Sequence, residues 1–216
     1  MKNLKAALIV LACSFFYPAI VSAQVDLSLK ARGTGFYGKF GQTYAAIGYE
    51  PGITIKPSVS KPWAGGVSYS KNILGYDANS NLEADMNLVT FHLGGKGSIG
   101  KYVHPFAYAL LGFRFMSYDN DDIATDDDPL FTSFSLGYGT RAGLQIGSGK
   151  WRFEGSIEFL TGTRSRYLTP ESFEKAADSG QSYRDFTYRS PIMGLSVGAG
   201  VAYVFSWSSL QSDLDE

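Results

Sequence analysis

The sequence predicts an all-β protein, an eight-stranded antiparallel up-and-down transmembrane β-barrel. Three observations predict it: strict alternation of apolar with small or polar residues, connections that are short and long in turn, and a beginning typical of an exported chain. Among the 216 residues, glycine (25), phenylalanine (15) and tyrosine (14) are common. This length suits one domain, and the aromatic content favours β-structure.

The first residues have the three-part layout of a secretory signal peptide. Two lysines form a basic start, an apolar run follows, and small residues precede Gln24. We therefore expect residues 1–23 to be removed and the mature chain to start at Gln24. Two alternatives are a retained membrane anchor, which Pro18 disfavours, and lipidation of Cys13, which the apolar residues after it disfavour. Cys13 is the only cysteine, so the mature chain is expected to have no disulfide.

Alternation with a period of two marks each expected strand, because successive side chains of a strand point to opposite faces. The last strand shows it best: every second residue from Met193 to Trp207 is apolar, and the intervening residues are mostly small. At about 3.3 Å per residue, this segment is long enough to cross a ~30 Å hydrocarbon layer with a strong tilt. In chain order, the expected strands are residues 27–34, 47–57, 63–70, 89–96, 107–116, 134–146, 151–160 and 193–207.

Each of the other seven strands opposes an apolar face to a polar or small one. The first sets leucines against a lysine and an arginine, and the second sets isoleucines against a glutamate and a lysine. The second also contains Pro51 and Pro57, each of which removes a donor from the ladder. The third and fourth alternate large apolar residues with serine, threonine, histidine and lysine. The fifth, sixth and seventh place arginine or glutamate opposite phenylalanine, leucine and isoleucine.

The connections supply independent support for a barrel, because they alternate between short and long. The short ones are residues 60–62, 98–103 and 147–150, and the long ones are residues 71–84, 119–132 and 162–189. This rhythm indicates an outer-membrane barrel with both termini on the short-turn, periplasmic side. The alternative is a secreted, soluble β-sandwich. That fold does not explain why the charged residues stay on one face of the strands or why aromatic residues gather at the strand ends.

Three features resemble the small eight-stranded outer-membrane barrels of the OmpA and OmpX type. They are the hairpin around His104-Pro105-Phe106-Ala107-Tyr108, the glycine-rich alternation from Leu195 to Tyr203, and the aromatic end at Phe205. The resemblance covers about residues 24–207 and implies contact with outer-membrane lipids and lipopolysaccharide, and insertion by the barrel assembly machinery. Such proteins often stop at the last-strand phenylalanine that is recognised during assembly. Here a polar, acidic tail, residues 208–216, follows it.

The inward faces carry a predicted charge cluster of seven basic and three acidic residues. Its members are Lys30, Arg32, Glu50, Lys56, Lys96, Arg114, Arg141, Arg152, Glu154 and Glu158. An eight-stranded barrel has an interior just wide enough for its own side chains. We interpret the cluster as a packed polar plug, because unpaired buried charge is costly. The alternative is a narrow porin-like conduit for small anions.

No catalytic residue, metal site or cofactor is expected. Glu154 and Glu158 are four residues apart on a strand, about 13 Å, which exceeds the ~5–9.5 Å between paired glycosidase carboxylates. His104 falls at a turn and His92 points into the barrel, so neither is placed to activate a serine nucleophile. The 19 basic and 20 acidic residues nearly balance, which gives no electrostatic case for nucleic-acid binding.

The predicted function is therefore a structural or surface-interaction role carried by the long loops. The loop of residues 119–132 is rich in aspartate but lacks EF-hand spacing. We interpret it either as a solvated charged loop or as a loose divalent-cation site shared with lipopolysaccharide. The longest loop, residues 162–189, is the predicted site for an extracellular protein partner, with a mobile surface loop as the alternative. Residues 170–178 favour a short helix there. The interaction candidates are Arg164, Arg166, Tyr167, Tyr183, Arg184 and Tyr188, because exposed Arg and Tyr often dominate binding.

Overall fold

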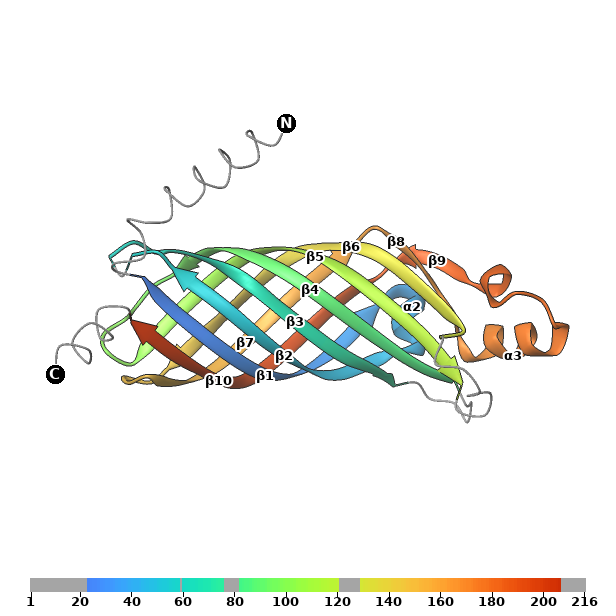
Figure 1. Cartoon of the computed structure of the whole chain (residues 1–216), viewed down its shortest axis with the longest axis horizontal. Helices are drawn as coiled ribbons and strands as arrows, with labels where there is room; N and C mark the ends of the chain where they lie inside the picture. Colours follow the sequence, from blue (N-terminus) through green and yellow to red (C-terminus); the bar gives the residue numbers. More distant parts are fainter. Residues whose placement is uncertain (1–22, 59, 76–81, 121–128, 207–216) are drawn as a thin grey trace, which may run out of the picture.

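Eight antiparallel strands close into one barrel in the computed structural model, which describes residues 23–58, 60–75, 82–120 and 129–206 (Figure 1). Around the barrel the strand order is β1-β10-β7-β6-β5-β4-β3-β2. The fold class predicted from the alternation is confirmed. The barrel strands are β1 (Gln24–Tyr37), β2 (Ala45–Lys56), β3 (Trp63–Gly75), β4 (Leu82–Lys96), β5 (Val103–Asn120), β6 (Phe131–Ile146), β7 (Trp151–Gly162) and β10 (Met193–Ser206).

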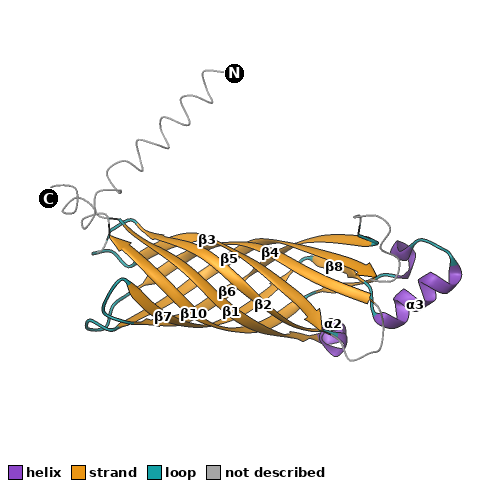
Figure 2. Cartoon of the chain, turned by 60° about the horizontal axis from the view of Figure 1, so that its bottom comes forward, coloured by secondary structure: helices purple, strands orange, loops and turns teal. Residues whose placement is uncertain are grey.

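The two ends of the barrel differ in their connections. The start of β1 pairs with the end of β10 and with the end of β2, Gln24 lying opposite both Ser206 and Lys56. The short turns lie at this same end, which we call the turn end. The opposite end, the cap end, carries the remaining elements (Figure 2). They are α2 (Gly38–Thr43), β8 (Arg164–Tyr167), α3 (Pro170–Ser179), the 3₁₀ helix η1 (Tyr183–Phe186) and β9 (Tyr188–Pro191).

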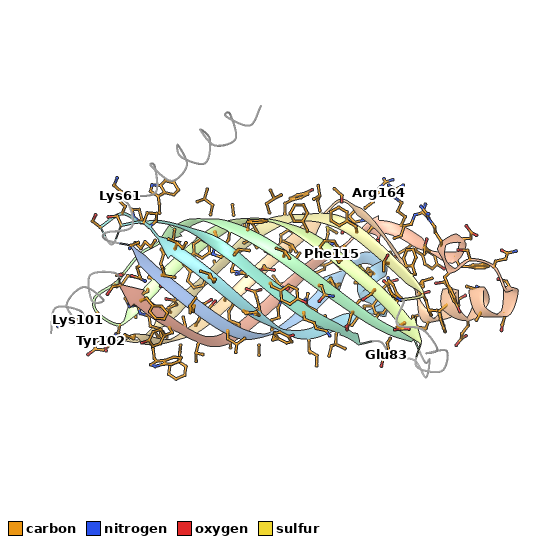
Figure 3. The ribbon with its side chains drawn as sticks, in the orientation of Figure 1. Lys61, Glu83, Lys101, Tyr102, Phe115 and Arg164 are labelled. Atoms are coloured by element: carbon orange, nitrogen blue, oxygen red, sulfur yellow. The ribbon has the colours of Figure 1, made fainter. Side chains whose placement is uncertain are left out.

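The outer wall of the barrel is apolar between the two ends. Phe153 is 73% exposed, and Trp151, Ile47 and Leu93 are almost as open. Soluble monomers rarely expose a continuous apolar surface of this extent. Charged residues gather instead at the ends: in Figure 3, Lys61 and Lys101 mark the turn end and Glu83 and Arg164 the cap end.

Exposed aromatic side chains pack against one another at several levels of the wall. At the turn end, the ring of Tyr203 lies 4.8 Å from that of Trp151 and 4.6 Å from that of Phe205. Toward the cap end, Phe134 packs against Phe115 with 5.2 Å between ring centroids. No helix among the described residues is both long and apolar enough to cross a bilayer.

Helix α3, expected over residues 170–178, forms over Pro170–Ser179. Thr169 is its N-cap: the side chain accepts a hydrogen bond from the main-chain N–H of Ser172, and the Ser172 hydroxyl satisfies the N–H of Thr169 in return. Pro170 fits the first helical turn, where its missing N–H costs nothing. Gly180 ends the helix in the left-handed region at φ 66°, a conformation that glycine adopts without strain.

Candidate functional site

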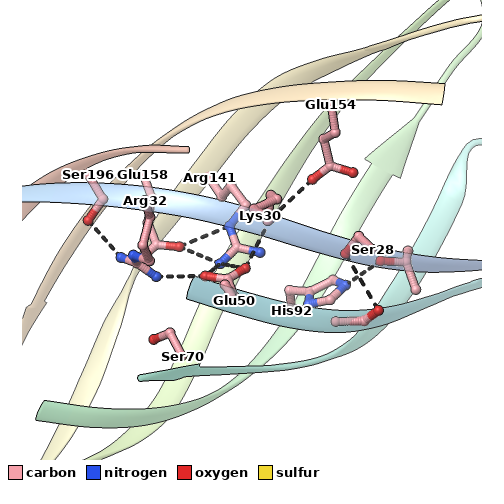
Figure 4. A network of polar contacts seen from close by, with 12 residues as sticks. Ser28, Lys30, Arg32, Glu50, Ser70, His92, Arg141, Glu154, Glu158 and Ser196 are labelled. Carbon is pink, nitrogen blue, oxygen red and sulfur yellow. Dashed lines mark hydrogen bonds and ion pairs between the residues drawn. The ribbon is translucent and has the colours of Figure 1, made fainter. Parts of the chain in front are cut away.

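The interior of the barrel holds an ionic network centred on Glu50 of β2 (Figure 4). Its carboxylate lies 2.9 Å from Lys30 Nζ, 2.6 Å from Arg32 Nη1 and 2.8 Å from Arg141 Nη2. Glu158 of β7 accepts from the same two arginines, at 2.9 Å and 2.5 Å. All five side chains are buried. Two carboxylates therefore hold three cations, and the five residues come from four different strands.

A second group extends this network toward the turn end. Lys30 also lies 3.1 Å from Glu154, and Glu154 accepts a hydrogen bond from the amide of Gln145 at 2.8 Å. Lys96 donates to Gln145 Oε1 at 2.6 Å and forms an ion pair with Asp26. The predicted charge cluster did not include Asp26 or Gln145. Asp26 lies on the same face of β1 as Lys30. A predicted strand starting at residue 24 instead of 27 would therefore have included Asp26 among the inward residues.

The remaining members of the predicted lumen cluster differ in their surroundings. Lys56 is buried at the turn end of β2, and Arg152 is only partly buried at the start of β7. Arg114 is almost fully buried and donates to the main-chain oxygen of Ile192 at 3.2 Å. It forms no ion pair with a carboxylate of the described chain. His92 lies inside, 2.9 Å from the Thr54 hydroxyl.

The charged layer leaves almost no free space. Within the described residues, the cavity among Lys30, Arg32, Glu50, Arg141 and Glu158 measures about 10 Å³, and so does the cavity beside His92. A single water needs roughly 10–15 Å³ on this measure. Buried apolar side chains occupy the space around the network, namely Ala64, Leu88, Phe106, Tyr108, Leu110 and Leu160.

The cap end is closed by an apolar core, which the sequence reasoning did not anticipate. We call it the cap core: Phe40, Tyr44, Ala46, Leu74, Leu82, Ala84, Met86, Met116, Tyr118, Tyr167, Leu168, Phe173 and Ile192. It joins inward residues of the barrel strands to α2, β8 and α3. Phe40 of α2 is fully buried, and its ring packs against those of Phe36, Tyr44 and Tyr167 at 4.9–5.0 Å.

The predicted interaction residues of the long loop separate into buried and open ones. The prediction of Tyr167 as a surface contact is wrong: it is 1% exposed, because β8 turns its Ser165 and Tyr167 side chains inward. Tyr183 is partly buried and stacks on Phe173, with 5.5 Å between ring centroids. Tyr188 remains exposed. The loop thus packs on the barrel through its aromatics.

The arginines of this loop lie around an external groove. Arg164, Arg166 and Arg184 line it together with Arg189, which the sequence reasoning did not select, and its volume is about 630 Å³. The other wall of the groove runs from Pro129 to Phe134, which covers the cap end of β6 and the two residues before it. The groove lies on the outer side of the barrel, where its lining residue Phe134 is exposed, and it shares no residue with the cavity of the ionic network.

Several predictions fall on residues outside the described ranges. They concern the expected signal peptide with Cys13, most of the aspartates of the loop at residues 119–132, and the tail at residues 208–216. Within the described part, no three His, Cys, Asp or Glu side chains gather in a way that would hold a metal ion.

Comparison with solved structures finds the same fold in outer-membrane barrels. Neisserial surface protein A superposes with a TM-score of 0.56 at 12% identity, covering 85% of this chain and 97% of that one. A major outer membrane protein of Thermus thermophilus gives 0.52 at 13% identity, covering 85% and 99%. No protein-family model matches the sequence, and no curated protein sequence matches it. The chain therefore shares the architecture of small outer-membrane barrels.

Proposed function

We propose that the protein is a closed outer-membrane β-barrel with a structural or surface-interaction role, carried by its cap end. The apolar, aromatic-rich wall supports a membrane position, because it suits lipid and would be unfavourable in water. The solved structures that share the fold include one named as an outer membrane protein and one named as a surface protein. Insertion of such a barrel would use the assembly machinery of that membrane.

The observation that carries the non-channel role is the filled interior. The ion pairs among Lys30, Arg32, Glu50, Arg141 and Glu158 close the charged layer. The cap core then covers its cap end. A porin leaves an aqueous channel, whereas the cavities beside Glu50 and beside His92 in the charged layer measure only about 10 Å³ each. The narrow anion conduit is the second candidate, because buried basic side chains outnumber buried acidic ones inside the described barrel.

The purified barrel, reconstituted in planar bilayers, is expected to give no stable, anion-selective conductance steps. The network supplies carboxylates beside each of Lys30, Arg32 and Arg141, so an entering anion meets cations that are already paired. Recordings at both polarities measure this directly.

The control for the recordings is that the reconstituted protein is a folded barrel, shown by a shift in gel mobility on boiling. Large, anion-selective steps from protein that passes this control would contradict the closed barrel and support the conduit.

We further propose that the turn end, with both termini, is periplasmic and the cap end extracellular. Short turns on the periplasmic side and longer loops outside are typical of such barrels. Glu174 on α3 and Lys101 at a turn are both exposed. In intact cells, a membrane-impermeant thiol reagent should label Glu174→Cys and leave Lys101→Cys unlabelled until the outer membrane is opened. Labelling of Lys101→Cys alone would reverse the orientation, and labelling of neither in intact cells would argue against an exposed cap.

A further inference from the structure

Four arginines converge on one external groove at the cap end, which we call the arginine groove. Arg164, Arg166, Arg184 and Arg189 line it with Ser182 and the segment 129–134 at the cap end of β6, around a volume of about 630 Å³. In Figure 3, Arg164 projects away from the barrel at this level. A groove of this size accommodates a phosphorylated sugar or a headgroup of similar size.

The backbone directs two of these side chains, Arg164 and Arg166, toward the outer side of β8. Side-chain parity shifts by one residue at Thr163, where the chain leaves β7: Gly162 is buried, whereas Ser165 and Tyr167 carry the inward positions of β8. This local irregularity, of the kind that re-aims side chains at barrel rims, turns Arg164 and Arg166 outward. Hydrogen bonds from β8 to Ser133 of β6 fix the ribbon against the wall.

The pairing of β8 with β9 places two of the arginines side by side. Arg166 lies directly opposite Arg189 in the antiparallel register, and like charges in that position repel each other. None of the four arginines forms an ion pair with a carboxylate of the described chain. A bound anion with several oxygens would relieve this repulsion and satisfy the guanidinium donors in forked geometry.

The groove borders the apolar wall, and this position indicates where the anion comes from. Phe134 lines the groove and is itself 54% exposed, and Leu136, two residues further along β6, continues the same outward face. Phe134 also packs on the wall aromatics Phe113 and Phe115. A ligand in the groove thus has arginine at one end and lipid-facing aromatics at the other, which matches a lipid with an anionic headgroup.

We propose that the arginine groove binds the phosphorylated headgroup of an outer-leaflet lipid, with two or more phosphates shared among the four guanidinium groups. The acyl chains of this lipid would run along Phe134 and Leu136. The inference rests on the proposed outer-membrane placement and on the cap end facing outward. It deepens that proposal by naming the lipid class and the residues that recognise it.

The test uses the full mature chain, folded in zwitterionic detergent, with Arg166→Gln/Arg189→Gln as the variant. The matched control is Lys39→Gln/Lys175→Gln, which removes two positive charges from exposed cap-end positions outside the groove. Native mass spectrometry and a titration would measure binding of bis-phosphorylated lipid A, its mono-phosphorylated form and inorganic pyrophosphate. We expect the bis-phosphorylated lipid to bind most tightly, with about tenfold or greater weakening in the arginine variant. The control should bind as the unchanged protein does.

A thermal measurement separates lost binding from lost folding. Without lipid, Arg189→Gln is expected to melt no lower than the unchanged protein, because it removes a like-charge contact. Added bis-phosphorylated lipid should raise the melting temperature of the unchanged protein more than that of the double variant, since the stabilisation by a ligand falls as its affinity for the folded state falls.

Three results would overturn the proposal. Equal weakening in the lysine control would mean that binding follows net charge. Pyrophosphate binding as tightly as the lipid would mean a site for free anions. Equal binding of the bis-phosphorylated and mono-phosphorylated lipids would mean that the four guanidinium groups do not share two phosphates. Each result is obtained on protein that shows the mobility shift of a folded barrel, so failure here is distinct from failure of the barrel proposal.

Discussion

Replacing Glu50 with glutamine is expected to lower the free energy of unfolding by about 3–5 kcal/mol, the cost of leaving buried charge unpaired. Glu50 is 3% exposed and its carboxylate serves Lys30, Arg32 and Arg141. Glutamine keeps the volume but removes the charge, so three buried cations would share the remaining carboxylates. Urea unfolding of the barrel in lipid vesicles, followed by tryptophan fluorescence, measures the change.

The matched control is Glu171→Gln on α3. The Glu171 carboxylate accepts a hydrogen bond from Lys175 at 2.6 Å, which lowers the pKa of Glu171, but both side chains are open to water. Exposed pairs of this kind contribute little to stability, so this variant should unfold almost as the unchanged protein does. Adding Lys30→Gln to Glu50→Gln should recover part of the loss, because one unpaired cation is removed. Equal stability of Glu50→Gln and Glu171→Gln would contradict the central role of the network.

The barrel wall was predictable because its cause is local. Alternation of side chains along each strand follows from backbone geometry alone, and it assigned residues such as Lys30, Glu50 and Arg141 to the interior before any pairing was known. Which charges meet was not predictable, since Arg32 contacts Glu158, 126 positions away, only through the register of the strands between them. The strand ends were underestimated: β5 reaches Asn120, well past the expected end at residue 116.

The cap core was missed for a different physical reason. The segment Gly38–Thr43 contains two glycines in six residues and has too few apolar positions to show a helical period. Its one large apolar residue, Phe40, becomes buried only because the barrel end offers inward apolar side chains such as Met86 and Met116. The alternation along β4 predicts that Met86 points inward. Several apolar inward positions in a row near the long loops were the signal that another element would cover this end of the barrel.

Replacing Phe40 with alanine is the second change with a large expected effect, about 3–5 kcal/mol, typical of a buried Phe→Ala substitution. The loss should be confined to the cap. The wall is held by hydrogen-bonded strand pairing around the whole barrel, from β1 back to β10. Phe40 lies in α2 and takes no part in this pairing. The main-chain N–H of Tyr44 donates to the Phe40 oxygen at 2.9 Å, so its hydrogen exchange reports on α2 directly.

Exchange of the Tyr44 amide is therefore expected to accelerate by about 100-fold or more, while amides in the middle of β6 and β7 keep their protection. Phe153→Ala is the matched control, because Phe153 is 73% exposed on the wall and loses no packing inside the barrel. Since the ionic network lies below the cap core, Phe40→Ala should also remain closed in bilayer recordings. Uniform loss of protection across the wall would show that cap and barrel unfold as one unit. Unchanged exchange at Tyr44 would show that α2 does not depend on its buried ring.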